Sequence, residues 1–182
     1  GETILGDVSL FVVGYMLMFA YASWMLSNCS CIGQRMYLAS VGIFGVIMGI
    51  ISSYGICSFL GIFYGPMHSV MPFLMLGIGI DDMFVIMQCW DTQSAEERQG
   101  SLEKRFGFLM RNAGAAITVT SVTDIIAFGI GASTILPALQ SFCIYASVGI
   151  IATFIFQSSF FLAWMTLDQR RIEANRNSCC PC

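Results

Sequence analysis

Charged residues are scarce in this chain of 182 residues. Lysine and arginine number 8, aspartate and glutamate 11, and the charged fraction is 10%, against about 25% in soluble domains. This scarcity, together with 57% hydrophobic residues, excludes an ordinary soluble globule. A formal net charge of −3 without a basic stripe argues against binding of nucleic acid.

Histidine is almost absent, and familiar catalytic combinations are missing. The single histidine, His68, has no cysteine cluster beside it, which argues against a zinc site. We interpret His68 as a residue at the membrane interface. Because no nucleophile and base pair and no phosphate-binding loop is visible, we predict that the chain is not an enzyme and holds no cofactor. The chain begins at Gly1 without a basic flank, so we expect an excerpt rather than a signal peptide.

Long apolar runs dominate what remains. A helix needs about 20 residues to cross the hydrocarbon core of a bilayer, and five runs approach or exceed that length, at about residues 8–26, 37–61, 67–90, 113–133 and 137–167. We therefore predict an all-α, polytopic membrane bundle of five transmembrane helices, forming one domain over 1–182. The fifth run is long enough to require tilt or a cytosolic extension.

The segment 91–112 is expected to lie on the cytosolic side. Two interpretations of it stay open: an amphipathic helix packed against the bundle, or a solvated connector. In the first case, the apolar side would consist of Phe106, Phe108, Leu109 and Met110.

The basic residues predict the orientation of the chain, because short loops rich in lysine and arginine stay in the cytosol. All eight lie in the segments before the second run, before the fourth run and after the fifth. The N-terminus of the chain should therefore be outside and the tail 168–182 cytosolic. A start on the outside implies a preceding helix or an outside domain that this sequence does not include.

The eight cysteines are not expected to form a structural disulfide, because most lie on the predicted cytosolic side or within the runs. Cys179, Cys180 and Cys182 in the tail could be palmitoylated, could bind a metal or could remain plain thiols. Asn28 lies in a formal glycosylation motif but falls on the cytosolic side, so we predict that it carries no glycan.

Acidic residues inside the apolar runs are the most informative feature. Asp81 and Asp82 lie in the third run and Asp124 in the fourth. A charge at mid-bilayer costs at least about 2.5–3.5 kcal/mol, so such residues normally mark ion or proton pathways. Helical spacing places Thr120 and Ser121 on the face of Asp124. We predict that these five residues form a site for a coupling ion or proton.

Two adjacent carboxylates cannot easily both ionise in a medium of low dielectric constant. No basic residue occurs in the five runs, so compensation must come from a bound proton, a cation such as Na⁺, or a helix outside this sequence. The alternative is that the acids are protonated and simply join helices through hydrogen bonds.

Glycines in the runs predict close helix packing. Gly77 and Gly79 precede the aspartates, and Gly45 and Gly49 form a Gly-x-x-x-Gly step in the second run. That step could face a neighbouring helix or a sterol ring. Pro72 is expected to loosen or kink the outer half of the third run.

Four segments resemble the sterol-sensing domain of Patched and patched-related proteins. They are GIGIDDMFVIM (77–87), ITVTSVTDIIAFGIGA (117–132), LPALQSFCIYASVGI (136–150) and LDQRR (167–171). The wider group includes the Niemann–Pick type C sterol transporter and Dispatched, within the resistance-nodulation-division superfamily. The cysteine-rich tail favours the patched-related branch.

The resemblance implies helices two to six of a twelve-helix transporter whose second transmembrane half and outside domains lie beyond this sequence. It also implies that the aspartate pair carries a proton or cation whose flow drives lipid movement, in the plasma membrane or in endosomes. Two alternatives remain: a sterol sensor that regulates signalling without transport, and an assembly scaffold that depends on the glycine faces.

Overall fold

The computed structural model describes residues 12–17, 20–21, 36–94 and 100–173. All regular secondary structure in these ranges is helical. Four helical stretches are long and apolar enough to cross a membrane: Leu38–Phe59, Pro66–Asp91, Leu102–Gly131 and Pro137–Ile172. The polytopic helical bundle predicted from the sequence is therefore confirmed.

Helix α2 (Met36–Phe59) corresponds to the second apolar run. It ends where Gly61 adopts a positive φ of 69°, a conformation that glycine reaches without steric cost. The amide of Ile62 donates to the Cys57 carbonyl at 3.1 Å and that of Gly61 to the Ser58 carbonyl at 3.0 Å. This pair of hydrogen bonds is the Schellman arrangement that satisfies the last carbonyls of a helix.

The third run is divided into the 3-10 turn η1 (Pro66–Val70) and helix α3 (Met71–Asp91). Pro72 lies in the first turn of α3, directly after the 3-10 turn, so the regular α-helix begins beside it. A proline there removes an amide that has no partner within the helix anyway, so Pro72 is well tolerated at the start of α3.

Helix α5 (Leu102–Gly131) is longer than the fourth run. Residues 102–112 do not form a separate amphipathic helix, as one interpretation had it, but are the first turns of α5. The reason is a continuous stripe of buried residues at intervals of four, which runs from the first turns of α5 into its membrane-capable part: Leu109, Ala113, Ile117 and Ser121.

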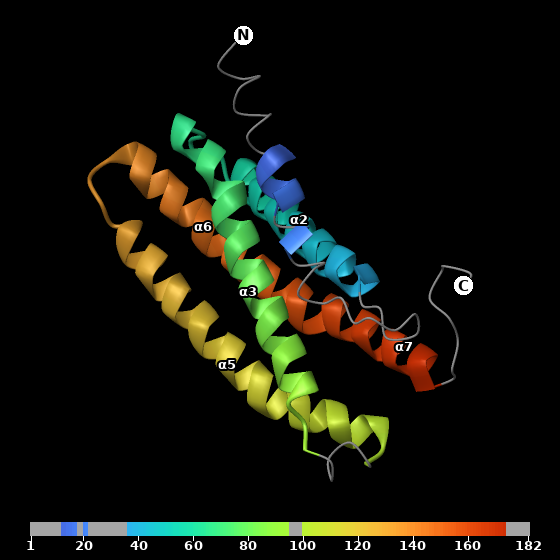
Figure 1. The fold of residues 1–182 in the computed structure, drawn as a ribbon. Coiled ribbons are helices and arrows are strands. Elements are labelled where there is room, and N and C mark those ends of the chain that lie inside the picture. Colours follow the sequence, from blue (N-terminus) through green and yellow to red (C-terminus); the bar gives the residue numbers. More distant parts are fainter. Residues whose placement is uncertain (1–11, 18–19, 22–35, 95–99, 174–182) are drawn as a thin grey trace.

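The fifth run forms helix α6 (Pro137–Phe156), the π-helical turn η2 (Gln157–Phe161) and helix α7 (Leu162–Glu173). Helix α6 lies at the centre of the bundle and packs against α2, α3 and α5. Figure 1 shows α5 and α6 side by side and antiparallel, with α3 crossing them. The α3 face in contact with the other helices is rich in methionine, including Met71, Met75, Met83 and Met87.

Of the first predicted run, 8–26, only residues 12–17 and 20–21 are described, and both ranges are helical. This segment lies against α3. The Tyr21 ring meets the Phe84 ring edge-on at 5.7 Å, and a Cβ atom on Gly14 would lie 2.3 Å from the Phe73 ring.

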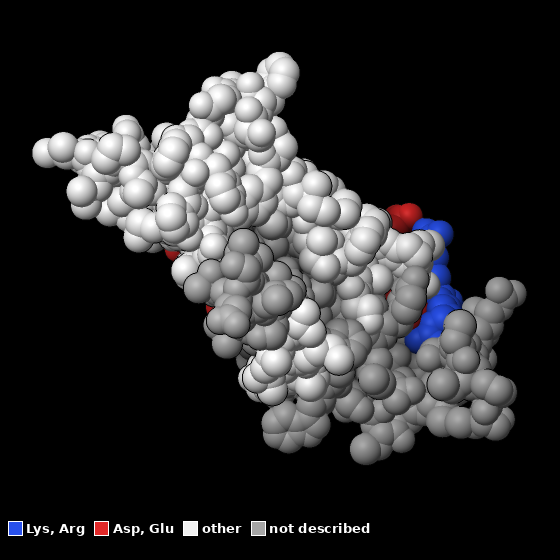
Figure 2. Space-filling view, turned by 90° about the horizontal axis from the view of Figure 1, so that it is seen from above, with Lys and Arg blue, Asp and Glu red and all other residues white. Residues whose placement is uncertain are grey.

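The beginning of α5 and the end of α7 lie at the same end of the bundle (Figure 1). These two segments carry the described basic residues Lys104, Arg105, Arg111, Arg170 and Arg171. Figure 2 shows a face that is uncharged over most of its area, with lysine and arginine gathered at one end.

Candidate functional site

Asp82 lies in a buried, otherwise apolar stripe along α3. The stripe has the spacing of a helix face packed against neighbours and consists of Met71, Met75, Leu76, Gly79, Ile80, Asp82, Met83, Ile86, Met87 and Trp90. Asp82 is only 5% exposed and lies near the middle of α3, within the membrane-capable stretch Pro66–Asp91. The sequence therefore places an ionisable group where a methionine or isoleucine would be expected.

The two other intramembrane acids lie on the same helix as Asp82 and on a helix that packs against it. Asp81, the adjacent residue, is left exposed by the rest of the described chain. Asp124 is half-buried on α5. Folding thus brings together three acids from two helices that pack against one another.

The hydroxyl residues of α5 face different surroundings. Ser121 is 3% exposed, and its Oγ has no hydrogen-bond partner among the described residues. Thr120 is exposed, and its hydroxyl donates back to its own helix, to the Ile117 carbonyl at 3.0 Å. Of the two hydroxyls predicted to accompany Asp124, only that of Ser121 points into the bundle.

The four glycines predicted to serve packing also differ. A Cβ atom on Gly79 would lie 2.3 Å from Cγ2 of Val46, and one on Gly49 would lie 2.4 Å from Oγ1 of Thr153. Around Gly77, no described atom lies within 4 Å of such a position, and at Gly45 the nearest is 4.0 Å away. The face of α2 that contains Gly49 is occupied by helix α6.

Gln157 and Thr153, which our sequence analysis did not single out, are the most buried polar residues near the acids. Their exposed fractions are 0% and 1%. The Gln157 amide donates to the carbonyls of Gly79 at 3.1 Å and Gly42 at 3.3 Å. A polar amide inside the fifth apolar run was the signal that could have identified Gln157.

His68 lies near the beginning of the membrane-capable stretch Pro66–Asp91, and its ring is fully buried within the protein. It packs in an aromatic cluster, 4.5 Å from the Tyr145 ring and 4.8 Å from that of Tyr64. The Tyr54 hydroxyl donates to the His68 carbonyl at 2.9 Å. These contacts fasten η1 to α2 and α6.

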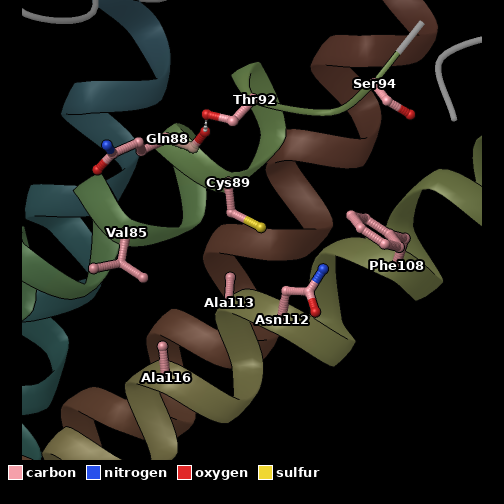
Figure 3. A pocket seen from close by; sticks show the side chains of 9 residues that line it. All are labelled: Val85, Gln88, Cys89, Thr92, Ser94, Phe108, Asn112, Ala113 and Ala116. Carbon is pink, nitrogen blue, oxygen red and sulfur yellow. Dashed lines mark hydrogen bonds between the residues drawn. The ribbon is translucent and has the colours of Figure 1, made fainter.

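A groove of about 480 Å³ opens between the end of α3 and the first half of α5. Its wall changes from apolar side chains deep in the bundle to polar ones near the connector (Figure 3): Val85, Gln88, Cys89, Thr92, Ser94, Phe108, Asn112, Ala113 and Ala116. The side chains of Cys89 and Asn112 point into it from opposite helices (Figure 3). Of the predicted site residues that the structure describes, none lines this groove.

Several predictions concern residues outside the described ranges: the unmodified Asn28 and the palmitoylation of Cys179, Cys180 and Cys182. Within the described residues, Cys57, Cys89 and Cys143 are free thiols. No group of three histidine, cysteine or acidic side chains in this part of the chain could hold a metal ion.

Comparison with known proteins identifies the family. Residues 31–182 match the family described as the sterol-sensing domain of SREBP cleavage-activation. The chain belongs to the sterol-sensing domain family. The acids, the buried glycines and the π-turn described above all lie within the matched range.

This sterol-sensing domain is similar to human protein patched homolog 2, with 33% identity over 94% of the chain. It is 33% identical to protein patched homolog 1 of Danio rerio, over 97% of the chain. It is also 28% identical to NPC intracellular cholesterol transporter 1 of Sus scrofa, over 93% of the chain. The chain spans only 14% or 15% of the length of these relatives.

Proposed function

We propose that this chain is the sterol- or lipid-binding membrane domain of a patched-related, transporter-like protein. In this proposal Asp81, Asp82 and Asp124 bind a proton or cation whose movement is coupled to that of sterol or lipid. The relatives support it, since one is named an intracellular cholesterol transporter. The observation that carries the proposal is the buried Asp82 in the middle of a membrane-capable helix, with Asp81 beside it in the chain and Asp124 on the helix packed against it.

The physical argument concerns the charge on Asp82. Among the described residues, Asp82 has no ion-pair partner, and an unpaired carboxylate in a medium of low dielectric constant is costly. Binding a proton or a cation removes that cost, so the free energy of the bundle depends on whether the site is occupied. The exposed Asp81 beside it offers a route by which the ion could enter, and Ser121 offers a buried hydroxyl.

The remainder of the proposed protein comprises a second transmembrane half and outside domains, and it would complete the ion site. We further propose that the protein resides in the plasma membrane or in endosomes, with the start of this chain outside and its tail in the cytosol. Its partners would be membrane lipids, sterol among them.

Replacing Asp81 and Asp82 by asparagine in the full-length protein tests this function. Asparagine keeps the size of the side chain but cannot exchange a proton. We expect sterol redistribution between membranes to fall to background while binding of a photoreactive sterol is retained. Glu103→Gln, an exposed acid in the first turn of α5, is the matched control and should behave like the wild type.

Unchanged sterol redistribution in the aspartate variants would contradict ion coupling. If a signalling output still followed sterol in those variants, the chain would be a sensor rather than a transporter. An assembly scaffold would instead lose its function on Gly45→Leu and Gly49→Leu while the aspartates remain dispensable.

A further inference from the structure

The π-turn η2 begins with a polar side chain in the interior of the bundle. Gln157 is 0% exposed, and η2 interrupts an otherwise α-helical stretch from Pro137 to Ile172. A π-turn inserts an extra residue into an α-helix and occurs often at functional sites. The question is what Gln157 does at this point.

Its amide group links three parts of the bundle. Nε2 donates to the Gly79 carbonyl of α3 at 3.1 Å and to the Gly42 carbonyl of α2 at 3.3 Å. In an α-helix each of these carbonyls already accepts a bond from the amide four residues later. The bonds from Gln157 are therefore additional, and they hold α2 and α3 at a fixed position relative to η2.

Close packing at the two glycines accompanies these bonds. A Cβ atom on Gly79 would lie 2.3 Å from Cγ2 of Val46, and one on Gly42 would lie 2.3 Å from Sδ of Met83. The backbones are bare where the amide reaches them. The contact therefore depends on how α3 is rotated about its own axis. In another rotation, a side chain rather than the Gly79 carbonyl would face Gln157.

That rotation decides which aspartate is buried. Gly79 precedes Asp81 by two residues and Asp82 by three, and each residue turns an α-helix by about 100°. In the present rotation Asp82 faces the interior at 5% exposure, whereas Asp81 is exposed. A change of about one residue in rotation would exchange their surroundings.

Stabilisation of the bundle alone does not account for a glutamine at position 157. Its Oε1 atom has no hydrogen-bond partner among the described residues, and neither does Oγ1 of Thr153 one turn earlier. An orphaned buried acceptor costs folding free energy comparable to what a donor bond supplies. An apolar side chain of similar size would fill the space without that cost.

We propose that Gln157 is a positioning residue, which fixes the rotation of α3 through the Gly79 carbonyl and so determines that Asp82 faces the interior and Asp81 the exterior. This inference rests on the proposed function only in assigning a purpose to the acid pair. The positioning itself is a statement about geometry and can be tested separately.

The test uses Gln157→Met in the full-length protein, because methionine is close in size and donates no hydrogen bond. Dicyclohexylcarbodiimide, an apolar reagent that modifies carboxyl groups within membranes, is applied, and mass spectrometry gives the ratio of labelling at Asp82 to that at Asp81. We expect this ratio to change by about fivefold, the factor that corresponds to one net hydrogen bond. Sterol redistribution should fall in parallel. Gln140→Met, on the exposed side of α6, is the matched control.

The outcomes separate the inference from the proposed function. A wild-type labelling ratio in a folded Gln157→Met protein would overturn the positioning role, even if the aspartate variants abolish transport. Normal transport in the aspartate variants would overturn the proposed function, while an altered ratio would still support positioning. If Gln157→Met fails to fold, Gln157→Asn decides, since asparagine keeps the polar amide but is one methylene shorter and loses the bond to the Gly79 carbonyl: an altered ratio supports the inference and a wild-type ratio overturns it.

Discussion

At the scale of single residues, two glycines of α3 that are only two positions apart have very different surroundings. Gly79 is buried against Val46 and Thr153, while no described atom lies within 4 Å of a Cβ position at Gly77. Both have the same residue type and lie in the same motif. Their roles differ because a helix turns about 200° between them, so that they face different parts of the molecule.

We predict that Gly79→Ala destabilises the protein by about 1–3 kcal/mol, the usual cost of overpacking. The new Cβ would lie 2.3 Å from Val46 Cγ2 and 3.1 Å from Thr153 Cγ2, and β-branched side chains have few alternative rotamers. The apparent Tm of the full-length protein in detergent measures the effect. Gly77→Ala is the control and should be neutral or slightly stabilising, because alanine favours helices. Equal Tm changes in both variants would contradict the packing described at Gly79.

At the scale of elements, the end of α3 is fastened to the first turns of α5. The Arg105 guanidinium lies 4.4 Å from the centre of the Trp90 ring, and Trp90 stacks on Phe106 at 4.6 Å. Gln93 donates to the Arg105 carbonyl at 3.1 Å and accepts from Nε of Arg105 at 3.3 Å. These contacts explain why the first turns of α5 lie against the bundle instead of extending away from it.

Arg105→Met should weaken this contact by about 1–2 kcal/mol, from loss of a cation–π interaction and a hydrogen bond. Limited proteolysis of the connector 92–101, which should become faster, and the apparent Tm measure the change. Lys104→Met is the matched control, because Lys104 is exposed one residue away, and it should alter stability by less than about 0.5 kcal/mol. If both variants are cleaved as slowly as the wild type, the contact does not hold the two helices together.

At the scale of the whole molecule, the described basic residues gather at one end of the bundle, where α5 begins and α7 ends (Figure 1). The turn between α5 and α6 lies at the opposite end and holds no basic residue. That the basic end faces the cytosol stays a prediction from the charge rule.

Labelling of single cysteines by a membrane-impermeant maleimide tests that orientation in a background without native cysteines. Ile135→Cys, at a position 96% exposed in the α5–α6 turn, should react on intact cells. Lys104→Cys, at the beginning of α5, should react only after permeabilisation. The reverse pattern would overturn the predicted topology, and a glycan on Asn28 would do so as well.

The presence of whole membrane-capable helices could be predicted from the sequence. The lengths of the apolar runs give the four described stretches, because a segment without charges has no other stable environment than lipid or a protein interior. The start of the fourth run was predicted at residue 113, where the charged residues end, but α5 begins at Leu102. The helix is longer because the buried stripe that includes Ser121 starts at Leu109, among those charged residues.

The sequence by itself determined that this is a helical membrane protein, that three acids lie within its spans and that it resembles sterol-sensing domains. Only the tertiary structure decided that Asp82 is buried while Asp81 is exposed, that Gly79 is in close contact while Gly77 is not, and that Gln157 joins α2 and α3. The reason is that neighbouring residues on a helix face different directions. What each one meets depends on how all the helices pack, which no local pattern contains.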